Sequence, residues 1–106
     1  MTEQDIQNEI RLRLSELGYA VFRTNVGKRK CTDGRWFSTG LQKGHSDLYA
    51  VKNGRIYYIE VKTPTGRASP EQEKFLAVMR DRYGCCAGIA RSVEDAEELV
   101  KHGYET

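Results

Sequence analysis

Two carboxylates and a lysine flank a short turn motif in the middle of the chain. Asp47 precedes the dipeptide Asn53-Gly54, and Glu60 and Lys62 follow it. Asn-Gly between two runs rich in apolar and aromatic residues is a strong signal for a two-residue hairpin turn. Such a turn fixes the register of both strands, and counting back from it places Asp47 opposite Glu60.

This register predicts a site for a divalent cation. Side chains alternate between the faces of a strand, so Lys62 shares the face of Glu60. Two carboxylates about 4 Å apart repel by about 4 kcal/mol at an effective dielectric near 20. A cation between Asp47 and Glu60 would turn this repulsion into a net attraction. The alternative, an exposed salt-bridge cluster, gives no reason for two carboxylates to lie opposite each other. Tyr49 and Tyr58 lie opposite each other on the same face, and we interpret them as packing residues rather than base-stacking platforms.

The elements that position these residues follow from apolar periodicity and capping signals. Thr2 with Asp5 and Ser69 with Gln72 have the spacing of capping boxes, and Pro70 suits the first position of a helix. We expect, in order, a helix from Thr2 to Gly18, a strand over Tyr19–Asn25, a basic loop over Val26–Gly34, a short strand over Arg35–Thr39, hairpin strands over Asp47–Lys52 and Arg55–Lys62, a helix from Ser69 to Gly84, a buried strand over Cys85–Ala90, and a helix from Ser92 to Gly103.

A strand, a helix and another strand after the hairpin imply a parallel crossover connection. The predicted fold is therefore of the α/β class, with a mixed β-sheet flanked by helices. Leu48, Ala50, Ile59 and Val61 form the hairpin face opposite the charged residues and are expected to pack in the core.

Length and composition narrow the class of protein. A chain of 106 residues with 39% hydrophobic and 30% charged residues suits one soluble domain, predicted over residues 1–106. The apolar runs are too short to cross a membrane, and the amino-terminal residues form a polar helix pattern without a secretory core. We therefore expect a cytoplasmic protein. Three cysteines without a CxxC pair indicate neither a zinc ribbon nor a disulfide framework.

Positive charge is concentrated between residues 23 and 43. This stretch has six basic residues and one acid, a balance of +5, whereas the whole chain carries +2. Basic residues near an aromatic residue such as Trp36 suit contacts with phosphates and bases. A solvated loop is the alternative. The candidate nucleic-acid-binding residues are Arg23, Lys28, Arg29, Lys30, Arg35 and Lys43.

The chain resembles the PD-(D/E)xK nuclease superfamily, and more narrowly the virus-type replication-repair nuclease (VRR-NUC) domain. Ser46 stands where proline is usual in this family, and His45 fills a variable position. The matching segments are Arg23–Gly27, Gly44–Asp47, Glu60–Thr63, Gly66 and Ser69–Gln72.

The resemblance implies a restriction-endonuclease-like core that binds Mg²⁺ or Mn²⁺. Asp47, Glu60 and the carbonyl of Val61 would hold the metal. Lys62 would orient or activate the attacking water, and Gln72 would hold the active site from the second helix. Related nucleases often add a residue from the first helix, for which Glu3, Gln7 and Glu9 are open candidates.

The implied substrate is DNA, cut in a structure-directed manner in branched or four-way-junction form. By analogy, small stand-alone members of this family are phage- or prophage-associated. Paired incision of a junction needs two sites related by a two-fold axis, and the resemblance to such small members points the same way, so we expect a homodimer; no membrane partner is expected. The alternative is a non-catalytic nucleic-acid-binding module that retains the fold. A pure binder gains nothing from opposed carboxylates, so the nuclease is preferred.

Overall fold

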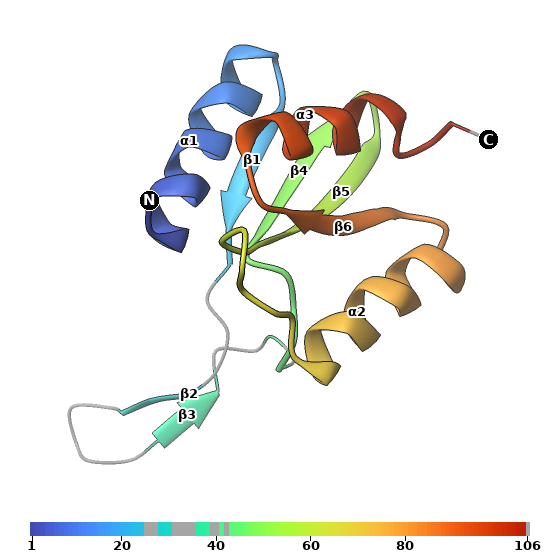
Figure 1. Cartoon of the computed structure of the whole chain (residues 1–106). Helices are drawn as coiled ribbons and strands as arrows, with labels where there is room; N and C mark the ends of the chain where they lie inside the picture. The colour runs from blue at the N-terminus through green and yellow to red at the C-terminus, as the bar shows by residue number, and fades with distance from the viewer. Residues whose placement is uncertain (25–27, 31–35, 39–40, 42, 106) are drawn as a thin grey trace.

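The computed structural model describes residues 1–24, 28–30, 36–38, 41 and 43–105. Helices surround a central sheet in Figure 1, and a small separate hairpin lies away from it. The elements are α1 (Glu3–Glu16), β1 (Ala20–Arg23), β2 (Lys28–Lys30), β3 (Trp36–Ser38), β4 (Leu48–Lys52), β5 (Arg55–Val61), α2 (Pro70–Asp81), β6 (Cys86–Ala90) and α3 (Val93–His102).

The main sheet has the strand order β1-β4-β5-β6. Strand β1 pairs antiparallel with β4, and β4 pairs antiparallel with β5. Strand β6 runs parallel to β5, with α2 in the crossover between them. The mixed sheet and the α/β class are confirmed.

The hairpin turn has the predicted register. Asn53 and Gly54 both have positive φ, at 53° and 76°, as a two-residue hairpin turn of this type requires. Lys52 then pairs with Arg55, and the same register continues as far as Leu48 opposite Ile59. The turn chemistry therefore fixes which residues face each other at the far end of the hairpin.

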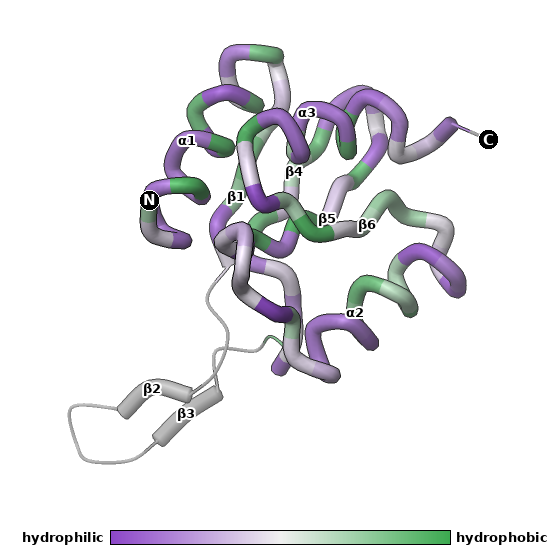
Figure 2. Tube along the Cα trace, viewed as in Figure 1, coloured by the Kyte–Doolittle hydropathy of each residue, from purple (hydrophilic) through white to green (hydrophobic). Residues whose placement is uncertain are grey.

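Helices α1 and α3 cover one face of the sheet, and α2 packs against the other. Leu48, Ala50, Ile59 and Val61 are completely buried, as predicted from the alternation of the strands. They share one core with Ile6, Ile10 and Leu14 of α1 and with Ala96 and Val100 of α3. Polar and apolar segments alternate along α1 and α3 in Figure 2, as expected of helices with one buried face.

Several boundaries and one element differ from the sequence predictions. Strand β4 begins at Leu48 and β5 ends at Val61, so Asp47 and Lys62 lie just outside the predicted hairpin strands. Strand β6 begins at Cys86, so Cys85 lies outside it. Strand β1 spans Ala20–Arg23, within the longer stretch that was predicted. The loop predicted over Val26–Gly34 was wrong for Lys28–Lys30, which form β2 and pair antiparallel with Trp36–Ser38. Three consecutive basic residues carry no alternation signal, and this strand arises from pairing with the aromatic strand β3.

No helix within the described ranges combines the length and the hydrophobicity needed to cross a bilayer.

Candidate active site

The far end of the β4–β5 hairpin brings the two predicted carboxylates together. Asp47 directly precedes β4, and Glu60 is the penultimate residue of β5. The side chain of Asp47 turns back onto the neighbouring strand, where its Oδ2 accepts a hydrogen bond from the backbone N–H of Val61 at 3.0 Å. This bond fixes the carboxylate of Asp47 beside that of Glu60.

A third carboxylate comes from the first turn of α1. One carboxylate oxygen from each of Glu3, Asp47 and Glu60 lies within 4.8 Å of the other two. Oxygens that share a cation at about 2.0–2.6 Å lie at most about 4–5 Å apart, so this spacing fits a divalent ion. Of the three helix candidates left open by the sequence, Glu3 therefore joins the site. Gln7 is buried one turn further along, and Glu9 is exposed.

Glu60 is the most unusual residue of the cluster. Its side chain is only 1% exposed, and neither carboxylate oxygen has a hydrogen-bond partner among the described residues. The pKa of Glu60 is raised from 4.5 to about 9, chiefly by burial and next by the adjacent Asp47 carboxylate, whereas the charge of Lys62 lowers it. Buried polar atoms normally have partners. The environment of Glu60 is thus not that of a solvated surface acid, and a cation bound here would compensate for the burial of its carboxylate.

Mg²⁺ and Mn²⁺ both suit such a set of oxygen ligands. The three carboxylates are hard donors of the kind these cations prefer, and the contribution of the Val61 carbonyl stays a prediction. Binding would require Glu60 to lose its proton, so metal affinity and pH are coupled at this site.

Lys62 continues the β5–β6 ladder one residue beyond β5. Its backbone N–H donates to the carbonyl of Ala90 at 3.1 Å. The positive charge of Lys62 acts on Glu60, as the pKa of that residue shows. A half-buried ammonium group beside the carboxylates can stabilise negative charge on a reacting phosphate.

The backbone around Asp47 is held by two hydroxyl groups, a feature that sequence reasoning missed. The hydroxyl of Thr24 donates to the carbonyls of Ser46 at 2.5 Å and Asp47 at 3.1 Å, and its backbone N–H donates to Asp47 at 2.8 Å. Ser46 is fully buried and donates its own hydroxyl to the carbonyl of Leu48 at 2.9 Å. Proline, which is usual at this position in the family that the chain resembles, has no donor for that bond.

Arg91 holds the loop that follows Lys62, and this too was not predicted. Its Nη1 donates to the carbonyls of Thr63 and Gly66, both at 2.6 Å, and lies 3.4 Å from that of Pro64. Arg91 directly follows β6, so its position depends on the parallel pairing of β5 with β6. Its place at a strand end was visible in the sequence, but the long-range pairing that brings the loop to it was not.

Gln72 forms the predicted capping box at the start of α2. Its Oε1 accepts from the backbone N–H of Ser69 at 2.8 Å, and the Ser69 hydroxyl accepts from the N–H of Gln72. This role orients the first turn of α2. The contribution of Gln72 to the active site stays a prediction.

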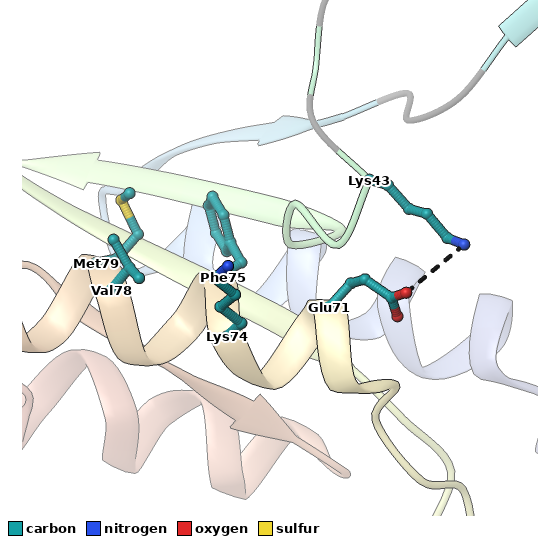
Figure 3. Close-up of a pocket in the computed structure, with 6 residues that line it drawn as sticks. All are labelled: Lys43, Glu71, Lys74, Phe75, Val78 and Met79. Carbon is teal, nitrogen blue, oxygen red and sulfur yellow. Dashed lines mark ion pairs between the residues drawn. The ribbon is translucent and has the colours of Figure 1, made fainter.

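The loop before Asp47 lies against this first turn of α2. Gly44 has a φ of 93°, and a Cβ there would lie 2.4 Å from the carbonyl oxygen of Glu71. Only glycine allows this close approach. Next to it, Lys43 forms an ion pair with Glu71 at 3.8 Å, drawn as a dashed line in Figure 3.

The predicted nucleic-acid-binding residues are distributed over several segments. Arg23 is exposed at the end of β1, and the side chain of Lys43 is 83% exposed. Lys28, Arg29 and Lys30 form β2. Arg35 lies outside the described residues.

Comparisons with known proteins identify the family and the fold. The model of the VRR-NUC domain family matches residues 1–94, which include Glu3, Asp47, Glu60 and Lys62. A solved structure of a VRR_NUC domain has a TM-score of 0.68 and 24% sequence identity, covering 96% of this chain and 98% of that chain. At this identity the solved structure shows a shared fold. A comparison with curated proteins finds no match.

Proposed function

The chain belongs to the VRR-NUC domain family, and from this premise we propose that it is a metal-dependent endonuclease that hydrolyses phosphodiester bonds in branched DNA. The observation that carries the proposal is the buried carboxylate of Glu60, without a hydrogen-bond partner among the described residues and close to Asp47 and Glu3. A binding module would have no use for such an arrangement, because burying a carboxylate without compensation destabilises the fold.

In this proposal Asp47, Glu60 and the carbonyl of Val61 hold Mg²⁺ or Mn²⁺, and Glu3 adds a third carboxylate. When bound, the cation polarises the phosphodiester and lowers the pKa of a coordinated water. Lys62 orients the attacking water and places positive charge where the phosphate gains negative charge. Gln72 supports the site from the start of α2.

The basic segments supply the contacts with DNA. In the sequence, exposed Arg23 precedes the β2–β3 hairpin and exposed Lys43 follows it. The first strand of this hairpin is Lys28–Lys30. Lysine and arginine bind the phosphate backbone without reading sequence, as expected of an enzyme that selects DNA by structure.

We further propose that two copies act together. Cutting both strands of a four-way junction needs two active sites related by a two-fold axis, which a closed homodimer supplies. Sedimentation equilibrium at micromolar protein concentration tests this assembly. A monomer mass that persists with junction DNA bound would favour single-strand incision of flaps instead.

A cleavage assay tests the proposed activity. Labelled four-way junctions, splayed arms and linear duplexes are incubated with the protein in Mg²⁺, Mn²⁺ or EDTA. We expect metal-dependent cleavage of the branched substrates, which Glu60→Gln and Asp47→Ala abolish while circular dichroism shows an intact fold. DNA binding without cleavage in any metal would instead identify a non-catalytic nucleic-acid-binding module.

A further inference from the structure

A continuous series of aromatic rings crosses the face of the sheet opposite the main core. Phe22 stacks on Tyr49, with ring centres 4.8 Å apart and planes at 19°. Tyr49 neighbours Tyr58 at 6.5 Å, and Tyr58 meets Phe75 of α2 edge-on at 5.3 Å. We name these four residues the aromatic row.

The aromatic row is open at its β1 end. Phe22 is 46% exposed, so its ring is accessible to a ligand at this end of the row. The row lies outside the core, which contains Tyr57 and Tyr19 on the other face of the sheet. Helix α2 packs on β6, and β1 lies at the opposite edge of the sheet. The interpretation of Tyr49 and Tyr58 as packing residues therefore accounts for the α2 side of the row and leaves Phe22 unexplained.

The aromatic row lies beside the carboxylate cluster. Tyr58 and Glu60 are two residues apart on β5, so both side chains point to the same face, roughly 7 Å apart along the strand. Tyr49 has the same separation from Asp47 at the start of β4. A DNA strand bound at the cluster would therefore have its neighbouring nucleotides within reach of the rings.

The α2 end of the row opens into a pocket. The cavity has a volume of about 230 Å³, with an apolar floor of Phe75, Val78 and Met79. Figure 3 shows Phe75 and Met79 extending from α2 toward the hairpin strands, with Lys43 and Glu71 at one end of the cavity. Lys74 is the remaining lining residue.

Apolar rings bordered by cations match the chemistry of unpaired nucleotides. Every base has a π-face that stacks on an aromatic side chain, and lysine or arginine contacts the phosphates. Exposed Lys43 and Lys74 lie at the α2 end of the row, where both line the pocket. A second copy of this chain would bring these like charges toward one another, which opposes association through this face.

We propose that the aromatic row and its pocket bind unpaired bases of the DNA strand next to the scissile phosphate. The inference rests on the proposed nuclease function and specifies its substrate class: DNA with single-stranded nucleotides beside the cut, as in a flap, a splayed arm or an opened junction. Phe22 is the outermost platform of this binding site.

The test uses single-stranded oligonucleotides that contain 2-aminopurine, whose fluorescence is quenched by stacking. EDTA keeps the DNA intact, so the readout is independent of cleavage. We expect the wild-type protein to change the fluorescence, and Phe22→Leu to lose this change together with roughly 5- to 150-fold in affinity for single strands. Phe22→Trp keeps both, and duplex affinity is the same for all three proteins.

Tyr83→Leu is the matched control, because Tyr83 is also an exposed aromatic residue and lies outside the row. Tyr49→Leu provides a second test within the row. The proposal would be overturned if both row variants kept the affinity and the fluorescence change of the wild-type protein. It would also be overturned if Tyr83→Leu lost affinity and fluorescence change to the same extent as the row variants. If Phe22→Leu dissociated a dimer and left the affinity for single strands unchanged, the stacking site would be ruled out and Phe22 would belong to a protein interface.

The two proposals fail in distinguishable ways. Metal-dependent cleavage of branched DNA by the wild-type protein, without any effect of the row variants on 2-aminopurine, would leave the nuclease function and remove the stacking site. A ring-dependent fluorescence change without cleavage in Mg²⁺ or Mn²⁺ would support the stacking site and remove the nuclease function.

Discussion

At the scale of single residues, the unusual feature is a carboxylic acid buried without a hydrogen-bond partner among the described residues. Glu60 lies on the face of β5 opposite the main core and is nevertheless only 1% exposed, with the Asp47 carboxylate beside it. Such a group lowers the stability of the metal-free fold and is expected where function requires it.

The raised pKa of Glu60, about 9, makes stability depend on pH in a defined direction. Between its ordinary value of 4.5 and about 9, the folded state keeps a proton that the unfolded state has lost. The free energy of unfolding of the metal-free protein should therefore fall as pH rises through this window, by up to about 1.4 kcal/mol per pH unit. Below about pH 4.5 Glu60 is protonated in both states, and its full contribution to the stability of the folded state is present.

Urea denaturation in EDTA at pH 5.5 and 8 measures this fall. Glu60→Gln cannot ionise, so the variant should lose this component of the pH dependence and be more stable than the wild type at pH 8. Glu16→Gln, at an exposed position on α1, should behave as the wild type. The same pH dependence in Glu60→Gln and the wild type would show that Glu60 is not the group responsible.

At the scale of elements, the site depends on three connections of different range. The Asn53-Gly54 turn sets the register as far as Leu48 opposite Ile59, which brings the adjacent Asp47 and Glu60 together. The α1 capping box at Thr2 sets the first turn that carries Glu3, and Arg91 holds the loop after Lys62. The first two are local in sequence. The third joins segments about 25 residues apart through the pairing of β5 with β6.

Arg91→Ala should loosen the Thr63–Gly66 loop without unfolding the sheet. Hydrogen bonds from a charged group typically contribute about 1.5–3 kcal/mol, so we expect a loss of unfolding free energy of up to that size. Hydrogen exchange of the Gly66 amide, which donates to Thr63, should accelerate more than exchange in β4. Arg82→Ala, an exposed arginine after α2, is the control. Unchanged exchange at Gly66 would mean that Arg91 does not hold the loop.

The difference between local and long-range contacts also explains which features the sequence could predict. The hairpin register, both capping boxes and the α/β class follow from neighbouring residues and are confirmed. The choice of Glu3 over Gln7 and Glu9 depends on how α1 packs across the sheet, which no local pattern specifies. Strand β2 was missed because Lys28–Lys30 acquires its structure by pairing with Trp36–Ser38, and the sequence of three basic residues suggested only a solvated loop.

At the scale of the whole molecule, charge is segregated along the chain. Residues 23–43 carry +5, whereas Ser92–Thr106 has five acids and one base. The carboxyl-terminal acids lie mainly on α3, and Figure 1 shows the β2–β3 hairpin on the far side of the sheet from this helix. If the proposed DNA contacts hold, this separation would direct DNA toward the basic side and away from the acidic helix.

Replacing Lys28, Arg29 and Lys30 by glutamine should weaken binding to all DNA sequences alike. The slope of log affinity against log salt should flatten by up to about 0.9 for each phosphate that the variant no longer neutralises. Binding of fluorescent duplexes and junctions, measured at several salt concentrations, gives this slope. Lys101→Gln on α3 controls for the removal of a positive charge away from β2. An unchanged slope in the triple variant would show that β2 does not bind phosphate.

That Glu60 is a metal ligand is tested most directly by isothermal titration with Mn²⁺ at pH 7, in two buffers of different ionisation enthalpy. The wild-type protein should bind Mn²⁺ and release up to about one proton, because Glu60 must ionise to bind. Lys62→Ala should retain binding, since the ammonium group is not a ligand, while its turnover falls by about 10²- to 10³-fold. Glu60→Gln should lose most of the affinity and the proton release. Wild-type Mn²⁺ affinity with the same proton release in Glu60→Gln would contradict the assignment of this carboxylate to a metal site.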